Sequence, residues 1–530
     1  MTPQPQRRIS WPNIFTLLAL ALVGVGYFSV FADLDWSWQV RTGEVIVQTG
    51  TLRVEDSFSY TIHGERLHDF EWLYEVLLYL VWNAFGSGGL KLLKVIVIFT
   101  PLLLVAWRLC VGGVKWHGVV LALGLAVFVL TPAWNLRPLY VTTIGLLLLA
   151  GLLRDHCTGR KPLPWWTVLV TLLWANMHPG VITGQGLLLG AIGWEWLNRR
   201  LMWNPPLDRP SITRLTLIGG LAFLATFVCP DPIERLRYTF MPELAHPIMR
   251  IFAEMHPLYT FITTPPSAVG LVYVLAALLM CSVFARFTDY RAWEIALLAG
   301  TALLGNIAYR SMMDWLLVML AVAGPRLKDM LASAARRDRR RPTTATLLRA
   351  DRCLRRCLTC PLFVFQPGWL ALGCAAFIVL SLVPAWSRAM PIENSPDWPV
   401  AALDAAQRAG LKGRFFGPPD YGAYVGWRLK DNGLCYTDTR GFFFPPLLLE
   451  DSHFIPQLGP QWRERIDRVI GCYHTDFFLL ETEGPRGQLW QTLQPHIDTP
   501  LYRDQKCVLL STAQVRQGLE RMDRALAGLR

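Results

Sequence analysis

The chain has 530 residues, of which 53% are hydrophobic and only 17% are charged, and it contains 22 tryptophans. A soluble core of this size does not need so many long uncharged segments, so the composition predicts a membrane protein with several spans. The formal net charge of +12 then reports mainly how the chain is oriented in the membrane, and it does not indicate a nucleic-acid partner.

The first apolar segment, at 13–32, follows Arg7 and Arg8. It ends in Val30-Phe31-Ala32, which resembles a signal-peptidase cleavage site. Its apolar part is as long as a full span, whereas the apolar part of a signal peptide usually has only ~7–15 residues. We therefore expect an uncleaved first helix whose amino-terminus lies in the cytoplasm.

A large outer loop, 33–70, follows this helix and is rich in carboxylates. Asp33 and Asp35 stand one residue apart at its start, where a carboxylate can act as general base for an acceptor hydroxyl or amide, or can help to bind a divalent cation. The alternative is that Asp33 caps a helix that begins at Trp36. The two interpretations are compatible, and we treat Asp33 and Asp35 as the catalytic candidates.

The other end of the outer loop carries Asp69 and Glu71, directly before an amphipathic helix predicted at 71–85. They are candidates for binding substrate, or for binding a cation together with Asp33 and Asp35, although Asp69 is equally suited to be a helix N-cap. Between the two ends, the polar and aromatic run 56–60 can shape an acceptor groove or form a structural turn.

Apolar windows of near span length follow one another along the rest of the chain. With the first helix they number about eleven, at 13–32, 90–110, 117–133, 138–154, 165–179, 182–197, 213–229, 267–285, 291–307, 311–325 and 367–386. With the amino-terminus inside, the basic loops 198–212 and 326–366 fall in the cytoplasm and the acidic loop falls outside, as the positive-inside rule requires.

The domain organisation follows from this topology. Residues 1–325 form a transmembrane domain, 326–366 a basic cytoplasmic linker and 367–386 a last span that exports the tail. The linker cysteines Cys353, Cys357 and Cys360 lack a fourth ligand at zinc-finger spacing, so we interpret them as reduced thiols.

The tail, 387–530, is predicted to be a small extracytoplasmic α/β domain, which in a Gram-negative cell lies in the periplasm. Strands are expected at 414–416, 423–429, 476–480 and 506–510, and helices at 398–410, 460–471 and 512–528. Cys435, Cys472 and Cys507 leave one disulfide possible, with its pairing open.

Two arginines are predicted at outer ends of spans. Arg137 precedes Pro138 before the fourth span, and Arg310 lies in the turn between the ninth and tenth spans. A guanidinium group holds phosphate with a fork of donors, so both are candidates for binding a lipid phosphate or pyrophosphate. The alternative is that their charges simply reach the aqueous interface.

Asn176 and His178 end the fifth predicted span. Polar side chains at this depth are costly unless they have a partner, which is either a phosphate or sugar or a satisfied hydrogen bond at the helix end. The outer loop 230–266, with His246, Arg250, Glu254 and His256, is long enough to form a lid. The sequence contains no P-loop and no dinucleotide fingerprint, which argues against an ATP-driven pump.

With these pieces in place, the chain resembles the GT-C superfamily of membrane glycosyltransferases, which includes aminoarabinose transferases, protein mannosyltransferases and oligosaccharyltransferases. It is similar in particular to a bacterial group of multi-span proteins. The matching segments are Asp33-Leu34-Asp35-Trp36, Gly43, Asp56-Ser57-Phe58-Ser59-Tyr60-Thr61, Phe70-Glu71-Trp72-Leu73, Arg137-Pro138, Trp174-Ala175-Asn176-Met177-His178, Asp420-Tyr421-Gly422 and Thr437-Asp438-Thr439-Arg440.

The sequence departs from that group at two positions, where Gln39 and Phe70 replace expected histidines. The resemblance implies a polyprenyl-phosphate sugar as donor, a glycan, lipid or protein as acceptor, and a place in the bacterial cytoplasmic membrane. It leaves open whether a divalent cation or a partner subunit takes part. The alternative function is a catalytically inactive scaffold of the same fold that binds a lipid or an envelope protein, and the lost histidines favour it slightly.

Overall fold

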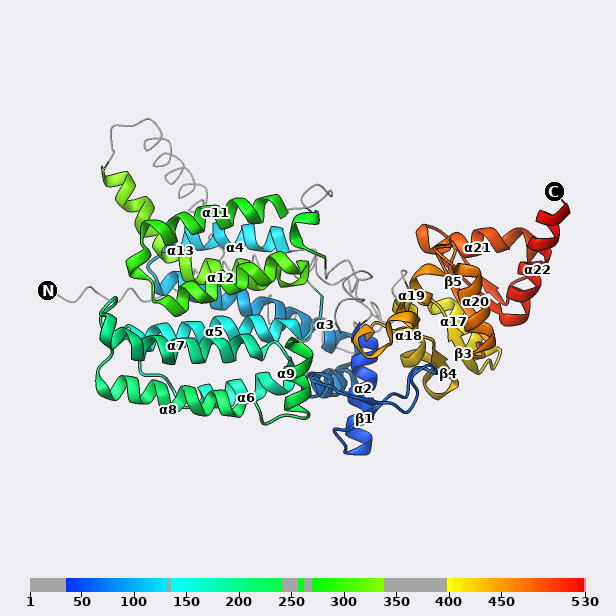
Figure 1. Ribbon diagram of the computed structural model, residues 1–530, viewed down its shortest axis with the longest axis horizontal. Helices are drawn as coiled ribbons and strands as arrows, with labels where there is room; N and C mark the ends of the chain where they lie inside the picture. The colour runs from blue at the N-terminus through cyan, green and yellow to red at the C-terminus, as the bar shows by residue number, and fades with distance from the viewer. Residues whose placement is uncertain (1–34, 131–134, 241–255, 262–268, 338–397, 529–530) are drawn as a thin grey trace. The chain divides into compact units, whose positions relative to one another are not determined.

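The computed structural model describes residues 35–130, 135–240, 256–261, 269–337 and 398–528 (Figure 1). The first and last predicted spans, the linker cysteines and most of the predicted lid lie outside these residues. The described chain is mostly helical, with a small mixed sheet near its carboxyl end.

The chain divides into two compact units. Unit 1 comprises Met1–Val30, Gly88–Cys229 and Glu254–Ser387. Unit 2 comprises Phe31–Ser87, Pro230–Ala253 and Arg388–Arg530. The acidic outer loop thus belongs to the same compact unit as the carboxyl-terminal tail, although more than three hundred residues separate them in the sequence.

Unit 1 is a bundle of helices that pack along one another (Figure 1). Its helices are the second part of α3 (Trp72–Val111), α4 (Trp116–Leu130), α5 (Leu139–Cys157), α6 (Thr167–Met177), α7 (Val181–Leu201), α8 (Arg209–Ala225), α11 (Val269–Ala285), α12 (Ala292–Ile307) and α13 (Met312–Arg337). Each predicted apolar window between 90 and 325 coincides with one of these helices, so the helical prediction is confirmed there.

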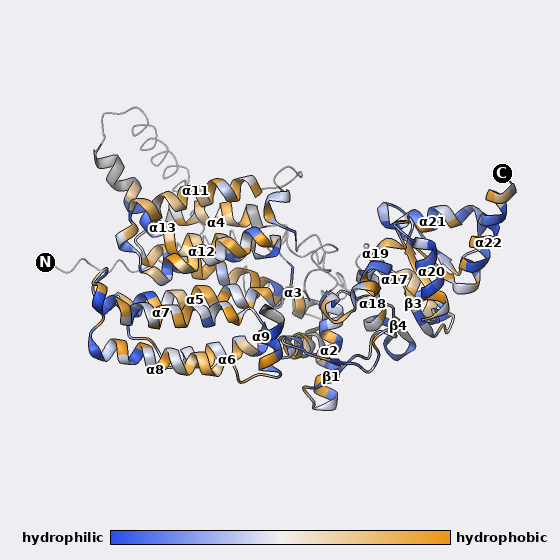
Figure 2. Ribbon diagram, in the orientation of Figure 1, coloured by the Kyte–Doolittle hydropathy of each residue, from blue (hydrophilic) through white to orange (hydrophobic). Residues whose placement is uncertain are grey.

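Two of the described helices, Trp72–Val111 and Leu139–Cys157, are long and apolar enough to cross a membrane, and several others are apolar but shorter. The helices of unit 1 also carry large apolar side chains on their outer surface, such as Leu121, Leu189 and Leu303, which are 51%, 51% and 62% exposed. Figure 2 shows hydrophobic residues along most of their length. An apolar surface of this extent is expected of helices that contact lipid.

Buried ion pairs join the ends of several helices in unit 1. Glu294 at the start of α12 contacts both Arg154 of α5 and Arg326 of α13, the latter at 3.0 Å. Arg291 pairs with the fully buried Glu195 of α7. A buried charge is tolerated only when it is paired, so these contacts fix which helix ends lie together.

Helix α3 changes direction at Gly86, whose backbone angles (φ 56°, ψ −147°) are not helical. Glycine has no Cβ and adopts such a conformation at little steric cost. The kink separates a first part, up to residue 85, which belongs to unit 2, from the apolar second part in unit 1. The boundary agrees with the amphipathic helix predicted at 71–85.

Unit 2 contains a five-stranded mixed sheet in the order β4-β3-β5-β7-β6. Strand β3 is parallel to β4 and β5, and β7 is antiparallel to β5 and β6. The strands are β3 (Gly413–Phe416), β4 (Gly433–Cys435), β5 (Phe477–Glu481), β6 (Tyr502–Arg503) and β7 (Cys507–Ser511). The predicted α/β class of the tail is therefore confirmed.

Unit 2 also contains helices, several of which contact the strands. They are α2 (Asp35–Thr49), α9 (Pro232–Phe240), α17 (Val400–Arg408), α18 (Pro419–Leu429), α19 (Pro446–Phe454), α20 (Trp462–Gly471), α21 (Gln488–Leu493) and α22 (Thr512–Gly528). A two-stranded antiparallel ladder, β1 (Val54–Glu55) with β2 (Arg66–Leu67), spans the acidic loop.

The strand predicted at 423–429 is wrong, because these residues lie in helix α18. The buried side chains Tyr421, Tyr424, Val425 and Leu429 recur at helical spacing, and Pro419 stands at the start of the helix, where its missing N–H costs nothing. The cysteines Cys435, Cys472 and Cys507 are all free, so the disulfide left open by the sequence does not form among them.

The acidic loop extends the edge of the sheet. Ser59 forms a parallel bridge with Cys435 of β4. The Cys435 N–H donates to the Phe58 carbonyl at 2.8 Å, and the Tyr60 N–H donates to the Cys435 carbonyl at 3.0 Å. The run 56–60 is therefore a structural segment that is docked on the sheet, as the structural alternative predicted.

A buried arginine holds this segment in place. Arg440 Nη2 donates to Asp56 Oδ1 at 2.6 Å, and its Nε donates to both carboxylate oxygens of Asp438 at 3.0 Å. The side chains of all three residues are at most 1% exposed. Asp56 also accepts from the Ser59 hydroxyl at 2.7 Å, and the Arg440 guanidinium lies 4.6 Å from the ring centre of Phe58.

We predict that Asp56→Ala destabilises unit 2 by about 3 kcal/mol, because it leaves part of a buried guanidinium charge uncompensated. Thermal unfolding of the purified protein, followed by tryptophan fluorescence, measures the change. Glu65→Ala, which removes an exposed carboxylate from the same loop, is the matched control and should leave the midpoint unchanged. Equal midpoints for the two variants would contradict the role assigned to Asp56.

Candidate functional site

Asp35 is the first residue of helix α2 in unit 2. Its carboxylate is partly buried, and the indole N–H of Trp38 donates to Oδ1 at 3.4 Å. A carboxylate in the first turn of a helix is stabilised by the backbone N–H groups and the helix dipole, which favours its ionised form. Asp33, its predicted partner, lies outside the described residues.

Asp69 lies between β2 and helix α3, where its Oδ1 accepts from the Glu71 N–H at 2.8 Å. Its side chain also interacts with Glu75, one turn into α3, a residue the sequence analysis did not single out. The oxygens Asp69 Oδ2 and Glu75 Oε2 are buried, and no N–H or hydroxyl among the described residues reaches them. Burial therefore disfavours the ionised form of these two carboxyl groups.

The electrostatics of Asp69 agree with this arrangement. Burial raises the pKa of Asp69, and the opposing effects of its hydrogen bonds and of the Arg440 charge only partly offset the increase. Arg440 therefore acts on two groups of carboxylates: it binds Asp56 and Asp438 directly and attracts Asp69 at longer range. The pKa of Arg440 is itself raised, because Asp438 and Asp56 outweigh the lowering effect of burial.

A second contact on the acidic loop involves Asp231, at the start of α9. Arg66 Nη2 donates to both of its carboxylate oxygens, at 2.6 and 2.9 Å, and His68 Nδ1 lies 2.8 Å from Oδ2. Partial burial raises the pKa of Asp231, but the hydrogen bond with His68 and the charge of Arg66 outweigh it and lower the pKa overall. This part of the loop 230–266 is thereby attached to β2.

The remaining predicted residues lie in unit 1, where His178 follows the last residue of α6. Its Nδ1 accepts from the Gly180 N–H at 3.1 Å and lies 2.6 Å from the Thr142 hydroxyl. Because a backbone N–H can only donate, Nδ1 carries no proton and Nε2 is the protonated nitrogen of the neutral ring. The indole N–H of Trp174 donates to the same Thr142 hydroxyl at 3.1 Å, so the ring orientation is fixed.

Arg310 lies in the short 3-10 turn Tyr309–Ser311 between α12 and α13, and its charge acts on His178. The structure thus brings these two predicted residues into the same region of unit 1. Arg137 precedes α5, and the Tyr140 N–H at the start of that helix donates to its carbonyl at 3.3 Å. The Asn176 amide donates to the carbonyls of Leu172 and Val228, at 2.9 and 2.8 Å, so its N–H groups are used within the bundle.

A metal site is not formed by the described residues. Among them, no group of three or more His, Cys, Asp and Glu side chains has an arrangement that could hold a metal ion. The predicted cation site that combines Asp33 and Asp35 with Asp69 and Glu71 stays a prediction, because Asp33 lies outside the described residues.

Sequence reasoning missed Glu75 and the electrostatic role of Arg440. Glu75 looks like an ordinary polar residue of an amphipathic helix, and only the crossing of α2 with α3 buries it. Gly43 of α2 makes this crossing possible, because a Cβ at that position would collide with the Glu75 carbonyl. Arg440 stood in a matching segment of the resemblance, but nothing in the sequence paired it with Asp56.

The fold is similar to that of known oligosaccharyltransferases. The apo crystal structure of the Archaeoglobus fulgidus oligosaccharyltransferase matches with a TM-score of 0.54 and 12% identity, covering 90% of this chain and 70% of that chain. A structure of the archaeal oligosaccharyltransferase AglB from the same organism, in complex with an inhibitory peptide and a dolichol-phosphate, matches with a TM-score of 0.52 and 11% identity, covering 88% and 69%. No protein-family model and no curated protein sequence matches the chain.

We predict that Asp69→Asn stabilises the protein at pH 7, because the amide keeps the hydrogen bond to Glu71, removes a carboxyl group whose ionisation burial disfavours, and offers a donor to Glu75. The pKa of Asp69 in the folded protein lies above its ordinary value of 3.8, so ionisation of this carboxyl group lowers the stability of the fold. This loss of stability is full above the folded-state pKa and disappears as the pH falls through it. The gain in thermal midpoint over wild type should therefore shrink between neutral pH and about pH 4.

Asp231→Asn is the control of opposite sign. Because the pKa of Asp231 is lowered, its contribution to stability is present above 3.8 and is lost only as the pH falls through its folded-state pKa. This variant should lower the midpoint at pH 7. A loss of stability in Asp69→Asn as large as that in Asp231→Asn would show that Asp69 is ionised and needed in that form.

Proposed function

We propose that the chain is a GT-C-type glycosyltransferase of the bacterial cytoplasmic membrane. It moves a sugar from a polyprenyl-phosphate donor at the outer face to a protein, lipid or envelope glycan. The observation that carries the proposal is the fold match, which extends over 90% of the chain and so includes both the helical bundle and the α/β unit. The acidic loop directly after the first predicted span supplies the carboxylates that are proposed to act as bases.

Two carboxylates are the proposed bases. Asp35, or Asp33 two residues earlier, removes the proton from the acceptor nucleophile, which then attacks the anomeric carbon of the sugar. The bond between that carbon and the phosphate oxygen breaks, and the lipid phosphate leaves with the electron pair. The helix dipole at Asp35 favours the ionised carboxylate that a base requires.

Two arginines of unit 1 are proposed to stabilise the leaving group. Arg310 and Arg137 each offer a fork of N–H donors that suits phosphate oxygens, where negative charge develops in the transition state. The neutral His178 is proposed to bind the same substrate. Asn176 has a structural contact for its amide and contributes at most through its carbonyl oxygen.

On the acidic side, Asp69 and Glu71 are proposed to orient the acceptor. Asp69 is held by the Glu71 backbone and by Glu75, so it cannot change its position without breaking a buried pair. Such a fixed carboxyl group is suited to positioning a substrate. The archaeal protein of similar fold binds a dolichol-phosphate and an inhibitory peptide, which agrees in kind with the donor and acceptor proposed here.

The second candidate function is a scaffold of the same fold without catalysis. Gln39, where the resemblance leads us to expect a histidine, is buried in α2, and its Oε1 finds no hydrogen-bond donor among the described residues. A site that has lost an ionisable group and left a buried carbonyl unsatisfied is a possible sign of relaxed function. Such a scaffold would bind a polyprenyl lipid or an envelope protein without transferring sugar.

We predict that Asp35→Asn and Asp33→Asn reduce product formation by about 100-fold or more while fold and bound lipid are kept, because only the proton acceptor is removed. Mass spectrometry of the glycans and lipids formed by membranes that contain each variant measures the loss. A scaffold would show no product in wild type and no difference between the variants.

Lipids that copurify in mild detergent test the donor. A polyprenyl phosphate, with or without its sugar, should be bound by wild type and lost from Arg137→Ala/Arg310→Ala. Arg160→Ala, which removes an exposed arginine from the turn after α5, should keep it. Bulk phospholipid alone in all three samples would contradict the proposed function.

A further inference from the structure

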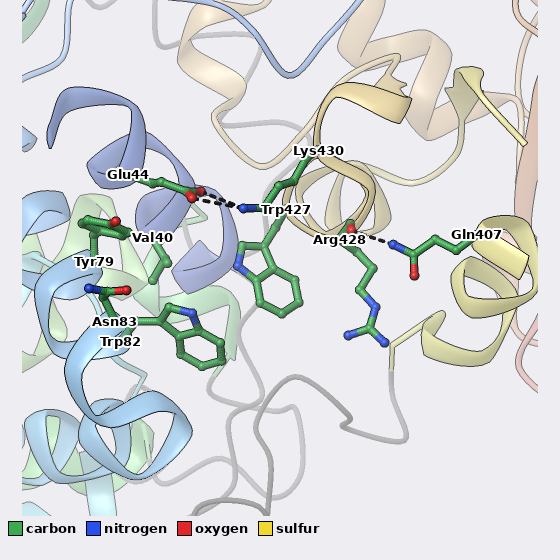
Figure 3. A pocket seen from close by; sticks show the side chains of 9 residues that line it. All are labelled: Val40, Glu44, Tyr79, Trp82, Asn83, Gln407, Trp427, Arg428 and Lys430. Atoms are coloured by element: carbon green, nitrogen blue, oxygen red, sulfur yellow. Dashed lines mark hydrogen bonds and ion pairs between the residues drawn. The ribbon is translucent and has the colours of Figure 1, made fainter. Parts of the chain in front are cut away.

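Unit 2 contains a cleft of about 510 Å³ between α2, the first part of α3, α17 and α18 (Figure 3). Its volume lies within the range typical of small-molecule sites. None of the residues assigned to transfer above lines this cleft. It therefore needs a separate explanation.

Aromatic rings form one part of its wall. The indoles of Trp82 and Trp427 lie 5.7 Å apart at an interplanar angle of 80°, so their faces point in different directions. Both pack against the buried indole of Trp36, at centroid distances of 5.4 and 4.9 Å. Because Trp36 is only 1% exposed, it holds the two half-buried rings as a rigid platform.

Neutral polar groups flank these rings. Figure 3 shows Trp427 between the side chains of α2 and α3 on one side and those of Arg428 and Gln407 on the other. The Gln407 amide N–H donates to the Arg428 carbonyl at 3.0 Å, which leaves its Oε1 directed away as an acceptor. The exposed Asn83 amide makes no hydrogen bond with any described residue, so it offers both donors and an acceptor.

The charged groups of the cleft compensate one another. Lys430 Nζ lies 3.0 and 3.3 Å from the two Glu44 oxygens. Arg41 donates to Glu44 Oε2 at 2.8 Å and to Asp431 at 3.2 Å, and Arg428 pairs with Asp404 at 2.6 Å, so three cations face three carboxylates. Partial burial raises the pKa of Glu44, but these cations outweigh it and lower the pKa, so the carboxylate stays ionised as an acceptor. The cleft has no excess of positive charge to attract a phosphate.

The backbone at Lys430, on the rim of the cleft, has an unfavourable conformation. Its φ of 50° lies in the left-handed region, which is unfavourable for a residue with a side chain. The conformation ends helix α18 and coincides with the contact between the Lys430 ammonium and Glu44. The rim of the cleft is therefore a fixed part of unit 2.

We propose that this cleft binds a saccharide. A sugar ring presents an apolar C–H face, which suits the half-buried indoles of Trp82 and Trp427, and a rim of hydroxyl groups, which suits the neutral amides and the ionised Glu44. A lipid tail would need a mainly apolar lining, whereas most of the exposed lining here is polar. The inference rests on the proposed function for its role, since it identifies the acceptor as a glycan that is held away from the transfer residues.

The test is binding of defined oligosaccharides to the full-length protein in detergent, measured by tryptophan fluorescence and calorimetry. Chitotetraose, maltotetraose and cellotetraose are the probes. Wild type should bind at least one of them, and Trp82→Ala should weaken that binding about 10-fold, as expected for one aromatic contact. Trp462→Ala, which alters a half-buried indole on α20 of the same unit, is the matched control and should bind as wild type does.

A second variant distinguishes a loss of saccharide binding from a loss of folding. Asn83→Ala changes only an exposed side chain that bonds to no described residue, so thermal unfolding should be unaffected. It should weaken saccharide binding about 5-fold or more through the loss of hydrogen bonds. Absence of binding by wild type up to about 10 mM of every probe, or equal binding by all variants, would overturn the inference.

The outcomes also separate this inference from the proposed function. If saccharide binding depends on Trp82 but the protein carries no polyprenyl phosphate and forms no product, the saccharide site is supported and the proposed transferase function is contradicted. If the protein carries polyprenyl phosphate and forms product but binds none of the probes, the transferase function is supported and the saccharide site is contradicted.

Discussion

The organisation of unit 2 depends on one buried cation. Arg440 binds Asp56 of the acidic loop and Asp438 of its own segment, and Asp56 lies 384 residues away in the sequence. The desolvation of a guanidinium group is expensive, so it is buried only when both carboxylates are present. This requirement links the segment that follows the first predicted span to the edge of the tail sheet. Helix α2 is attached to the tail by further contacts, among them the packing of Trp36 against Trp427 and the ion pair of Glu44 with Lys430.

The same cation acts at longer range on Asp69 and Glu75. Four carboxyl groups, those of Asp56, Asp438, Asp69 and Glu75, lie within the influence of one guanidinium group. Arg440 can compensate only the two that it contacts directly. In a poorly solvated region, the remaining negative charge is reduced most cheaply by protonation. The acidic loop therefore appears more highly charged in the sequence than it is in the folded protein.

The sequence predicted periodic elements well and long-range partners poorly. The apolar windows from 90 to 325 and the helix at 71–85 carry their own signal, because apolar residues recur over many turns. Helix α18 was mistaken for a strand, since Tyr424, Val425 and Trp427 favour strands locally and only packing decides between the alternatives. The pairing of Asp56 with Arg440 and the burial of Glu75 depend on contacts between distant segments, which periodicity does not encode. Asp35, Arg137, His178 and Arg310 remain functional predictions for the same reason: their roles depend on a substrate.

Helix α2 shows how one short element can serve several purposes. One face of this helix carries four residues at helical spacing, Trp36, Val40, Gly43 and Glu44. This face supplies the aromatic platform, the crossing with α3 and the rim of the cleft. Asp35 and Gln39 are four residues apart and share another face. A histidine at position 39 would place a second ionisable group beside Asp35, and glutamine removes that group while leaving the carboxylate and its helix terminus unchanged. The replacement therefore weakens the case for a metal at this point far more than it weakens the case for Asp35 as a base.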